Sequence, residues 1–260
     1  MRAAYLLPLA ASFLTLGCSD GTTGPELQAT TVADVLPSHN HLRNRLRDIV
    51  AEQNGGLGFE MWATILDRDG RVVDVVFSGT VRGDQWPGSR VISAQKANTA
   101  NAFSLEGFAL STANLFAAVQ PGGSLFGLQE SNPVDPAVAY GGKAADFGTR
   151  MDFMIGKRIG GVNVFGGGLA LYSTSGKLLG GLGVSGDTSC TDHIIAWKLR
   201  QYLNLDNVPG GVAAGTDNII FADGAPEGFE HPACFDNPGR GNHIEIANAL
   251  PATHEIGPNK

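Results

Sequence analysis

Two short motifs bring together the residue types that form disulfides or ligate metals. Cys190 and His193 are three residues apart, and His231 and Cys234 repeat that spacing in the opposite order. With Cys18 assigned to lipidation, as argued below, we expect a disulfide between the two remaining cysteines. A zinc site built from Cys190, His193, His231 and Cys234 is the alternative, and free thiols are a third. The disulfide and the zinc site would both bring the two histidines into one neighbourhood.

A helix predicted over Thr188–Leu203 carries three side chains suited to a flat anionic ligand. His193, Trp197 and Arg200 follow one another at i, i+4 and i+7, on one helical face. An imidazole can ligate iron, an indole can stack, and a guanidinium can pair with a carboxylate. A face covered by the C-terminal segment, or an interface with ordinary hydrogen bonds, would explain the same stripe.

A loop that leads into a second predicted helix is the other candidate for anion binding. Trp86 begins the loop and Arg90 lies at the helix start, where backbone N–H groups favour anions. Lys96 adds positive charge nearby. A well-capped helix with Trp86 packed on the sheet is the alternative. His39 and His41, near the start of the first helix, could each bind a metal.

The elements that must position these residues alternate between helices and hairpins. Apolar residues recur at i, i+4, i+7 and i+8 from Leu42 to Val50, which predicts a helix beginning near Ser38. Asp69-Gly70 is a strong signal for a tight turn between two strands. The other predicted elements are a short helix over Val32–Leu36, strands over Phe59–Leu66 and Val72–Phe77, a helix over Ser89–Leu105, a short helix over Thr112–Val119, and strands over Leu169–Tyr172 and Leu178–Val184.

Tandem hairpins with helices between them indicate an α+β domain, in which helices pack on an antiparallel sheet. We place this domain at residues 31–203. Residues 121–161 form a long loop rich in Pro and Gly, which suits a functional flap, an oligomer contact or irregular packing. Residues 204–260 show little periodicity, and we expect them to form an extended tail that wraps the domain and is pinned near Cys234.

Two sequence blocks carry a resemblance to a known family. One is the glycine-rich strand and turn that ends at Gly183–Gly186 and is followed by Asp192; the other is the alanine-rich helix with Lys96-Ala97-Asn98-Thr99-Ala100. The chain resembles the GlcG/HbpS family of haem-binding and haem-degradation-associated proteins, which includes the C-terminal domain of PduO-type proteins. The resemblance implies a profilin-like sheet with helices and haem as the cofactor. The haem-binding candidates are then His193, Trp197, Arg200, His231, Trp86, Arg90 and Lys96.

The first residues read as a targeting segment. Arg2 precedes an apolar run, Ala3–Leu16, and Gly17 places a small residue before Cys18. This pattern resembles a bacterial lipoprotein signal over residues 1–18, with ordinary secretion as the alternative. Residues 19–30 would be a flexible tether. We therefore expect export to the periplasm or outer surface and a lipid anchor in a membrane.

The composition and the motifs of the sequence argue against several classes of function. The formal charge of −7 over 260 residues, without a Lys/Arg cluster, argues against a nucleic-acid partner. The sequence contains neither a Gly-x-Ser-x-Gly elbow nor a Cys-x-x-Cys-His haem attachment motif. We expect a tethered haem-binding protein that stores, senses or helps degrade haem, and that forms a homo-oligomer. A ligand-free structural subunit is the alternative. An enzyme is the third hypothesis, although no acid–base pair stands out.

Overall fold

The computed structural model describes residues 31–222 and 228–256. The segment of residues 1–18, its Cys18 and the tether of residues 19–30 lie outside the described residues. Among the helices that are described, none combines the length and the apolar character needed to cross a bilayer.

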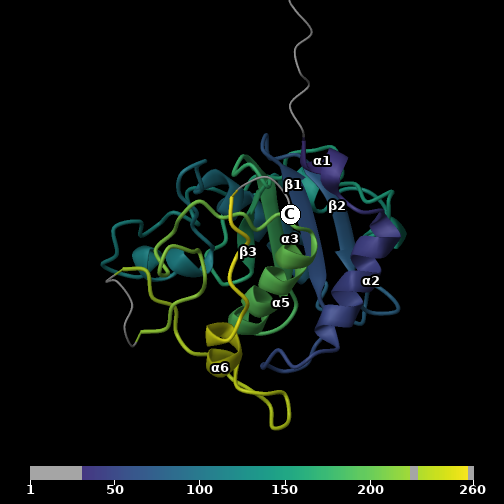
Figure 1. Cartoon of the computed structure of the whole chain (residues 1–260). Coiled ribbons are helices and arrows are strands. Elements are labelled where there is room, and N and C mark those ends of the chain that lie inside the picture. The colour runs from purple at the N-terminus through teal and green to yellow at the C-terminus, as the bar shows by residue number, and fades with distance from the viewer. Residues whose placement is uncertain (1–30, 223–227, 257–260) are drawn as a thin grey trace, which may run out of the picture.

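A four-stranded antiparallel sheet forms the centre of the fold, with the strand order β2-β1-β4-β3 (Figure 1). The last strand of the second hairpin pairs with the first strand of the first hairpin, which joins the two hairpins into one sheet. The predicted α+β class is therefore confirmed. The strands are β1 (Trp62–Asp67), β2 (Val72–Phe77), β3 (Gly168–Tyr172) and β4 (Leu178–Ser185).

Helices cover both faces of the sheet. Helix α3 (Ser89–Ala102) packs on one face, and α2 (His39–Val50) and α5 (Ser189–Tyr202) pack on the other (Figure 1). The close approach of α3 depends on glycine in β4, because a Cβ added to Gly183 would lie 1.9 Å from the carbonyl oxygen of Ser93. The small side chains of α3 thus match the bare backbone of the strand.

The largest apolar cluster lies between the sheet and the helix pair α2 and α5. Leu42 and Leu46 contribute from α2, and Ile195 and Leu199 contribute from α5; all are buried. The apolar spacing in the sequence identified this face of each helix, because residues that recur near the helical period share one side.

Two elements of the structure differ in detail from those that the sequence predicts. Strand β1 begins at Trp62 rather than Phe59, because the backbone N–H groups of Leu57, Gly58 and Phe59 donate to the Asp187 carboxylate instead of a neighbouring strand. The helix predicted over Thr112–Val119 is two 3₁₀ turns, η1 (Ala113–Leu115) and η2 (Ala117–Val119). Side-chain and backbone hydrogen bonds between Ser111 and Asn114 favour this tighter turn.

The irregular regions contain one short helix that the sequence pattern predicted and others that it did not. Helix α1 (Val32–Val35) matches the predicted helix near residue 32. Helix α4 (Pro136–Ala139) and the 3₁₀ turn η3 (Ala144–Asp146) lie in the long loop. Helix α6 (His243–Asn248) lies in the C-terminal segment, where the Asn242 side chain caps its first N–H groups.

The C-terminal segment is attached to α5. A disulfide joins Cys190, in the first turn of α5, to Cys234, with the two Cα atoms 6.1 Å apart. Further along the chain, the Trp197 indole in α5 donates to the carbonyl of Pro251 at 3.1 Å. Residues 228–256 therefore lie against α5 (Figure 1), and the structure contains the disulfide that the sequence predicts.

Candidate functional site

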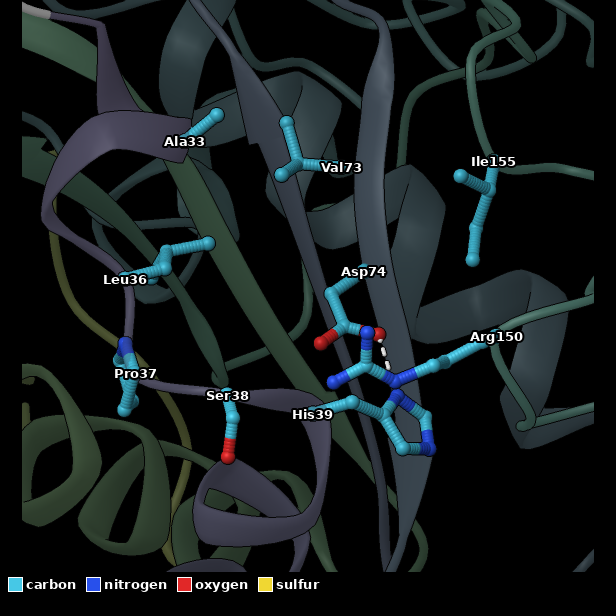
Figure 2. Close-up of a pocket in the computed structure, with 9 residues that line it drawn as sticks. All are labelled: Ala33, Leu36, Pro37, Ser38, His39, Val73, Asp74, Arg150 and Ile155. Atoms are coloured by element: carbon cyan, nitrogen blue, oxygen red, sulfur yellow. Dashed lines mark hydrogen bonds and ion pairs between the residues drawn. The ribbon is translucent and has the colours of Figure 1, made fainter.

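A pocket of about 290 Å³ opens where the start of α2 meets β2 (Figure 2). His39 lies in the first turn of α2, Asp74 lies in β2, and Arg150 comes from the long loop of residues 121–161. The three polar side chains converge on one hollow that is open to solvent. The remaining lining is mainly apolar and consists of Ala33, Leu36, Pro37, Ser38, Val73 and Ile155.

An imidazole and a carboxylate form the polar centre of this pocket. His39 Nδ1 lies 2.7 Å from Asp74 Oδ1, and both side chains are mostly buried, with 10% and 12% of their surfaces exposed. An ionised carboxylate only accepts hydrogen bonds, so Nδ1 is the ring nitrogen that donates, and Nε2 is the one left to offer a lone pair to a ligand. Nε2 makes no hydrogen bond to any residue in the described part of the chain.

Local structure explains why these two side chains meet. Ser38 caps α2 by accepting a hydrogen bond from the backbone N–H of His41, which fixes His39 at the helix start. In β2, Asp74 and Val76 share a face because strand side chains alternate. Val76 belongs to the apolar cluster that includes α2, so Asp74 also faces that helix.

The long loop completes the pocket. Arg150 extends toward the His39–Asp74 pair (Figure 2), and Ile155 adds an apolar wall. A guanidinium can pair with a carboxylate of a ligand in two parallel hydrogen bonds. The pocket thus offers one nitrogen ligand, one cation and apolar walls, a combination that suits an amphipathic anion carrying a metal.

The stripe predicted on α5 is covered by the C-terminal segment. His193 is fully buried, and its Nε2 accepts a hydrogen bond from the backbone N–H of Ile219 at 3.0 Å. Burial lowers the pKa of His193 to about 3, so the ring is neutral. Trp197 is also buried, and its indole N–H donates to the carbonyl of Pro251. The alternative, a face covered by the C-terminal segment, therefore describes this stripe, because residues from 204–222 and 228–256 contact it.

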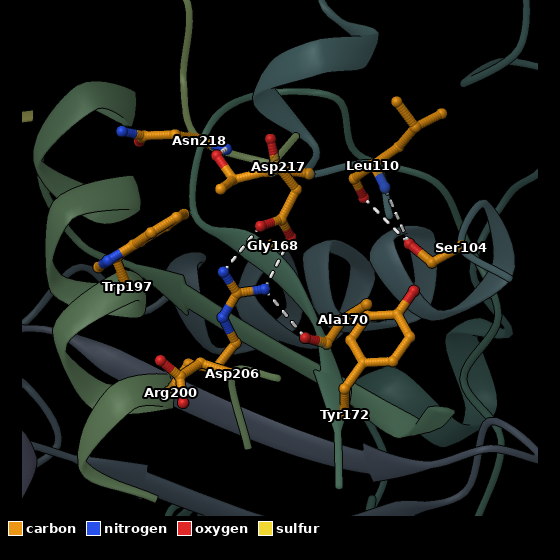
Figure 3. A network of polar contacts seen from close by, with 12 residues as sticks. Ser104, Leu110, Gly168, Ala170, Tyr172, Trp197, Arg200, Asp206, Asp217 and Asn218 are labelled. Carbon is orange, nitrogen blue, oxygen red and sulfur yellow. Dashed lines mark hydrogen bonds and ion pairs between the residues drawn. The ribbon is translucent and has the colours of Figure 1, made fainter. Parts of the chain in front are cut away.

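Arg200, the third member of the stripe, is held by a carboxylate from the C-terminal segment. Its two terminal nitrogens donate to the two oxygens of Asp217, each at 2.7 Å, and one also donates to the carbonyl of Ala170 (Figure 3). Both side chains of the ion pair have no exposed surface. Arg200 therefore stabilises the docking of the C-terminal segment and is not available to an external anion.

The loop at residues 86–90 does not form the expected anion site either. Arg90 is buried and donates to both carboxylate oxygens of Asp152 and, at 2.7 Å, to the carbonyl of Ala139. Trp86 is half exposed, and its ring lies 5.2 Å from that of Phe59. Because its donors are bound by the long loop, Arg90 anchors that loop to α3.

Lys96, the remaining cation among the candidates, is also buried. Its Nζ lies 2.7 Å from Asp192 Oδ2 and 3.2 Å from the carbonyl oxygen of Val184. Burial raises the pKa of Asp192 to about 6, while the charge of Lys96 opposes that rise. The pair links α3 to α5, and both side chains are almost fully buried.

The predicted zinc site at Cys190, His193, His231 and Cys234 does not form. Both sulfurs are joined in the disulfide, and His193 is engaged elsewhere. His231 Nδ1 donates to the carbonyl of Pro232 at 2.8 Å, while its buried Nε2 has no partner among the described residues. Burial lowers the pKa of His231 to about 4. His231 is therefore a buried neutral imidazole rather than a metal ligand in this arrangement.

Sequence reasoning identified His39 as a metal-binding candidate but missed both of its partners. Asp74 gave a signal, because it is the one charged residue in the otherwise apolar strand VVDVVF. A carboxylate at such a position needs a partner when it is buried. Arg150 gave no signal, since it lies in an irregular loop with several other charged residues.

Comparison with known proteins gives one family match. A model of the family described as haem degrading protein HbpS-like matches residues 40–200. This segment includes Asp74 and Arg150, and it begins one residue after His39. No curated protein sequence matches the chain significantly.

Three solved structures that are similar to this chain are compared with it by identity, coverage and TM-score. The PduOC:heme complex is 25% identical, covering 63% of this chain and 90% of that chain, with a TM-score of 0.42. The Klebsiella pneumoniae protein ORFY is 21% identical, covering 70% and 97%, with a TM-score of 0.45. HbpS is 15% identical, covering 71% and 99%, with a TM-score of 0.44.

Proposed function

The chain belongs to the haem degrading protein HbpS-like family, and we propose that it binds haem in the pocket lined by His39, Asp74 and Arg150. The observation that carries the proposal is the His39–Asp74 contact. It holds the imidazole with its Nε2 lone pair unused among the described residues. Metal-ligating histidines characteristically donate their other ring N–H to a carboxylate in this way.

The rest of the pocket fits the parts of a haem. His39 Nε2 would ligate the haem iron, as a histidine does in many haem proteins. Arg150 would pair with a propionate, and Leu36, Val73 and Ile155 would contact the porphyrin. When bound, haem would supply redox chemistry at iron. The chain's own residues would hold the group, and Asp74 would orient the His39 imidazole.

A haemin titration of the full chain tests the proposal through Soret absorbance. The expected result is a saturable band that His39→Ala loses. His41→Ala is the matched control, because His41 is exposed, two residues away and outside the pocket. His193→Ala and His231→Ala serve as further controls, since both rings are buried elsewhere. An unchanged titration in His39→Ala, with far-ultraviolet circular dichroism showing intact folding, would overturn the assignment.

The titration also addresses the ligand-free alternative. If the wild-type spectrum equals that of haemin mixed with an unrelated protein, a structural or interaction role becomes the better account. A titration that succeeds leaves storage, sensing and degradation to be separated by adding a reductant. Loss of the Soret band with release of iron would identify degradation, while a stable band would favour storage or sensing.

We also propose that the protein is exported and lipid-anchored through Cys18. The support is the sequence of residues 1–18, in which an apolar run ends at a small residue and a cysteine. Metabolic labelling with a radioactive fatty acid should mark the wild-type protein and not Cys18→Ser. Labelling of both proteins, or of neither, would contradict the anchor.

Self-association is proposed from the long loop. Phe126, Tyr140 and Met151 project from residues 121–161 with 68%, 65% and 74% of their surfaces exposed. Large exposed apolar side chains of this kind are characteristic of contact surfaces. Light scattering after size exclusion should give a mass above that of one chain. A monomer at micromolar concentration would contradict the proposal.

A further inference from the structure

The imidazole of His243, a potential metal ligand, lies beside the disulfide of Cys190 and Cys234. The sulfurs of Cys190 and Cys234 and a ring nitrogen of His243 all lie within 4.8 Å of one another. His243 belongs to α6, so the cluster joins three separate segments: the start of α5, the chain around residue 234, and α6. Two thiols and an imidazole are the residue types that bind zinc most often in proteins.

The imidazole is already oriented for such a role. His243 Nδ1 lies 2.7 Å from Asp236 Oδ2, so Nδ1 carries the proton that this carboxylate accepts. Nε2 therefore carries the lone pair of the ring. It faces the cysteines and accepts a hydrogen bond from the backbone N–H of Cys234 at 3.0 Å, which a bound metal would replace. A carboxylate that fixes the tautomer of a ligating histidine is a general feature of zinc sites.

We propose that reduction of the Cys190–Cys234 disulfide creates a zinc site with Cys190 Sγ, Cys234 Sγ and His243 Nε2 as its protein ligands. A dithiol reductant supplies two electrons and two protons, breaks the S–S bond and is itself oxidised to a cyclic disulfide. Zn²⁺ then displaces one proton from each thiol and binds both thiolates, which leaves a neutral Zn(S⁻)₂ unit. A water completes the tetrahedron.

Zinc binding requires the two sulfurs to separate after reduction and His243 Nε2 to exchange its hydrogen bond to the Cys234 N–H for the metal. Zinc–sulfur bonds of about 2.3 Å and zinc–nitrogen bonds of about 2.0–2.1 Å imply ligand separations of about 3.6–3.8 Å in a tetrahedron. Cys190 and His243 are buried and Cys234 is half-buried. The neutral zinc–dithiolate unit suits this partly buried place, because it places no net charge there. The site is separate from the His39 pocket, and it replaces His193 and His231 of the sequence-based zinc hypothesis with His243.

The test uses the full chain in its oxidised and reduced forms. The protein is reduced with excess dithiothreitol, freed of reductant under argon, and titrated with Zn²⁺ against a chromophoric chelator. One zinc per reduced chain is expected, bound at least 100-fold more tightly than by the disulfide form. Co²⁺ in place of Zn²⁺ should give the thiolate-to-metal absorption in the near ultraviolet and the intense visible bands of a tetrahedral site.

Variants identify the third ligand. His243→Ala should weaken zinc binding by the reduced chain at least 10-fold, and Asp236→Asn should weaken it about 10-fold through loss of orientation. His254→Ala is the matched control, because His254 Nδ1 also contacts a carboxylate, Asp206 Oδ1 at 2.6 Å, with no cysteine involved. It should bind zinc as the wild type does.

Three results would overturn the proposal. The first is equal zinc affinity of the reduced and oxidised chains. The second is unchanged affinity in both His243→Ala and Asp236→Asn, which would mean that the thiols alone bind the metal. The third is a reduced chain that loses its far-ultraviolet circular dichroism and does not regain it with zinc, because the site requires α5 and α6 to be folded together.

Discussion

The imidazole of His39 and the carboxylate of Asp74 lie 2.7 Å apart, although the two residues are 35 positions apart in the chain. The contact ties the first turn of α2 to the middle of β2. It also fixes which ring nitrogen is protonated, so that Nε2 is the one available for ligation.

Removing the charge of Asp74 should weaken haem binding without removing the axial ligand. Asp74→Asn keeps the shape of the side chain, but its neutral amide oxygen accepts a weaker hydrogen bond from Nδ1–H than a carboxylate does. We expect the haem dissociation constant to rise about 10-fold, within the range found for such orienting groups. Soret titration measures this. Asp69→Asn, at an exposed position, is the control, and an equal affinity in both variants would exclude an orienting role for Asp74.

The Arg200–Asp217 pair should be important for stability. Asp217→Ala leaves a guanidinium buried without its partner, which should lower the free energy of unfolding by about 3–5 kcal/mol. Asp69→Ala breaks an exposed contact with Arg158 and should cost less than about 1 kcal/mol. Urea denaturation of the wild type and of both variants measures the free energy of unfolding of each. Similar midpoints for both variants would mean that the C-terminal segment is not held by this pair.

The buried imidazoles of His193 and His231 should make the fold sensitive to acid. Their pKa values are lowered by burial to about 3 and about 4, whereas an unfolded histidine has a pKa of about 6.5. As the pH falls below 6.5, the unfolded chain takes up protons that the folded chain does not. The free energy of unfolding should therefore decrease between pH 6.5 and 4, by up to about 1.4 kcal/mol per pH unit for each ring.

A variant isolates the contribution of one ring. His231→Gln should lose less stability than the wild type between pH 7 and pH 4, measured by urea denaturation at each pH. The carboxyl group of Asp192 titrates in both proteins, so its effect cancels in the difference. His41→Gln, at an exposed position, should follow the wild type. A His231→Gln curve parallel to the wild-type curve would contradict a neutral buried ring.

The contact between α3 and β4 should not tolerate a methyl group. A Cβ at Gly183 would lie 1.9 Å from the Ser93 carbonyl oxygen, so Gly183→Ala must push the helix away from the sheet. We expect a loss of about 2–3 kcal/mol in the free energy of unfolding. Gly83→Ala has no heavy atom within 4 Å of the added Cβ and should change stability by less than about 0.5 kcal/mol. Equal melting temperatures would show that α3 can move at no cost.

Much of the fold could be predicted because its signals are local. The apolar spacing around Leu42 and Leu46 identified the buried face of α2, and Asp69-Gly70 identified the turn between β1 and β2. The cysteine count predicted the disulfide that the structure contains. In each case the pattern within a short window, or the number of one residue type, reports directly on burial or pairing.

The sequence by itself determined which residues could do chemistry, and the tertiary structure decided which of them are free to do it. His193, Trp197 and Arg200 share a helical face, but residues from 204–222 and 228–256 cover that face with hydrogen bonds and an ion pair. The path of that segment could not be read from its sequence, because it has little periodicity and is held by contacts with distant residues. His39 gained its partner in the same way, since only the packing of α2 on β2 brings a strand carboxylate to its ring.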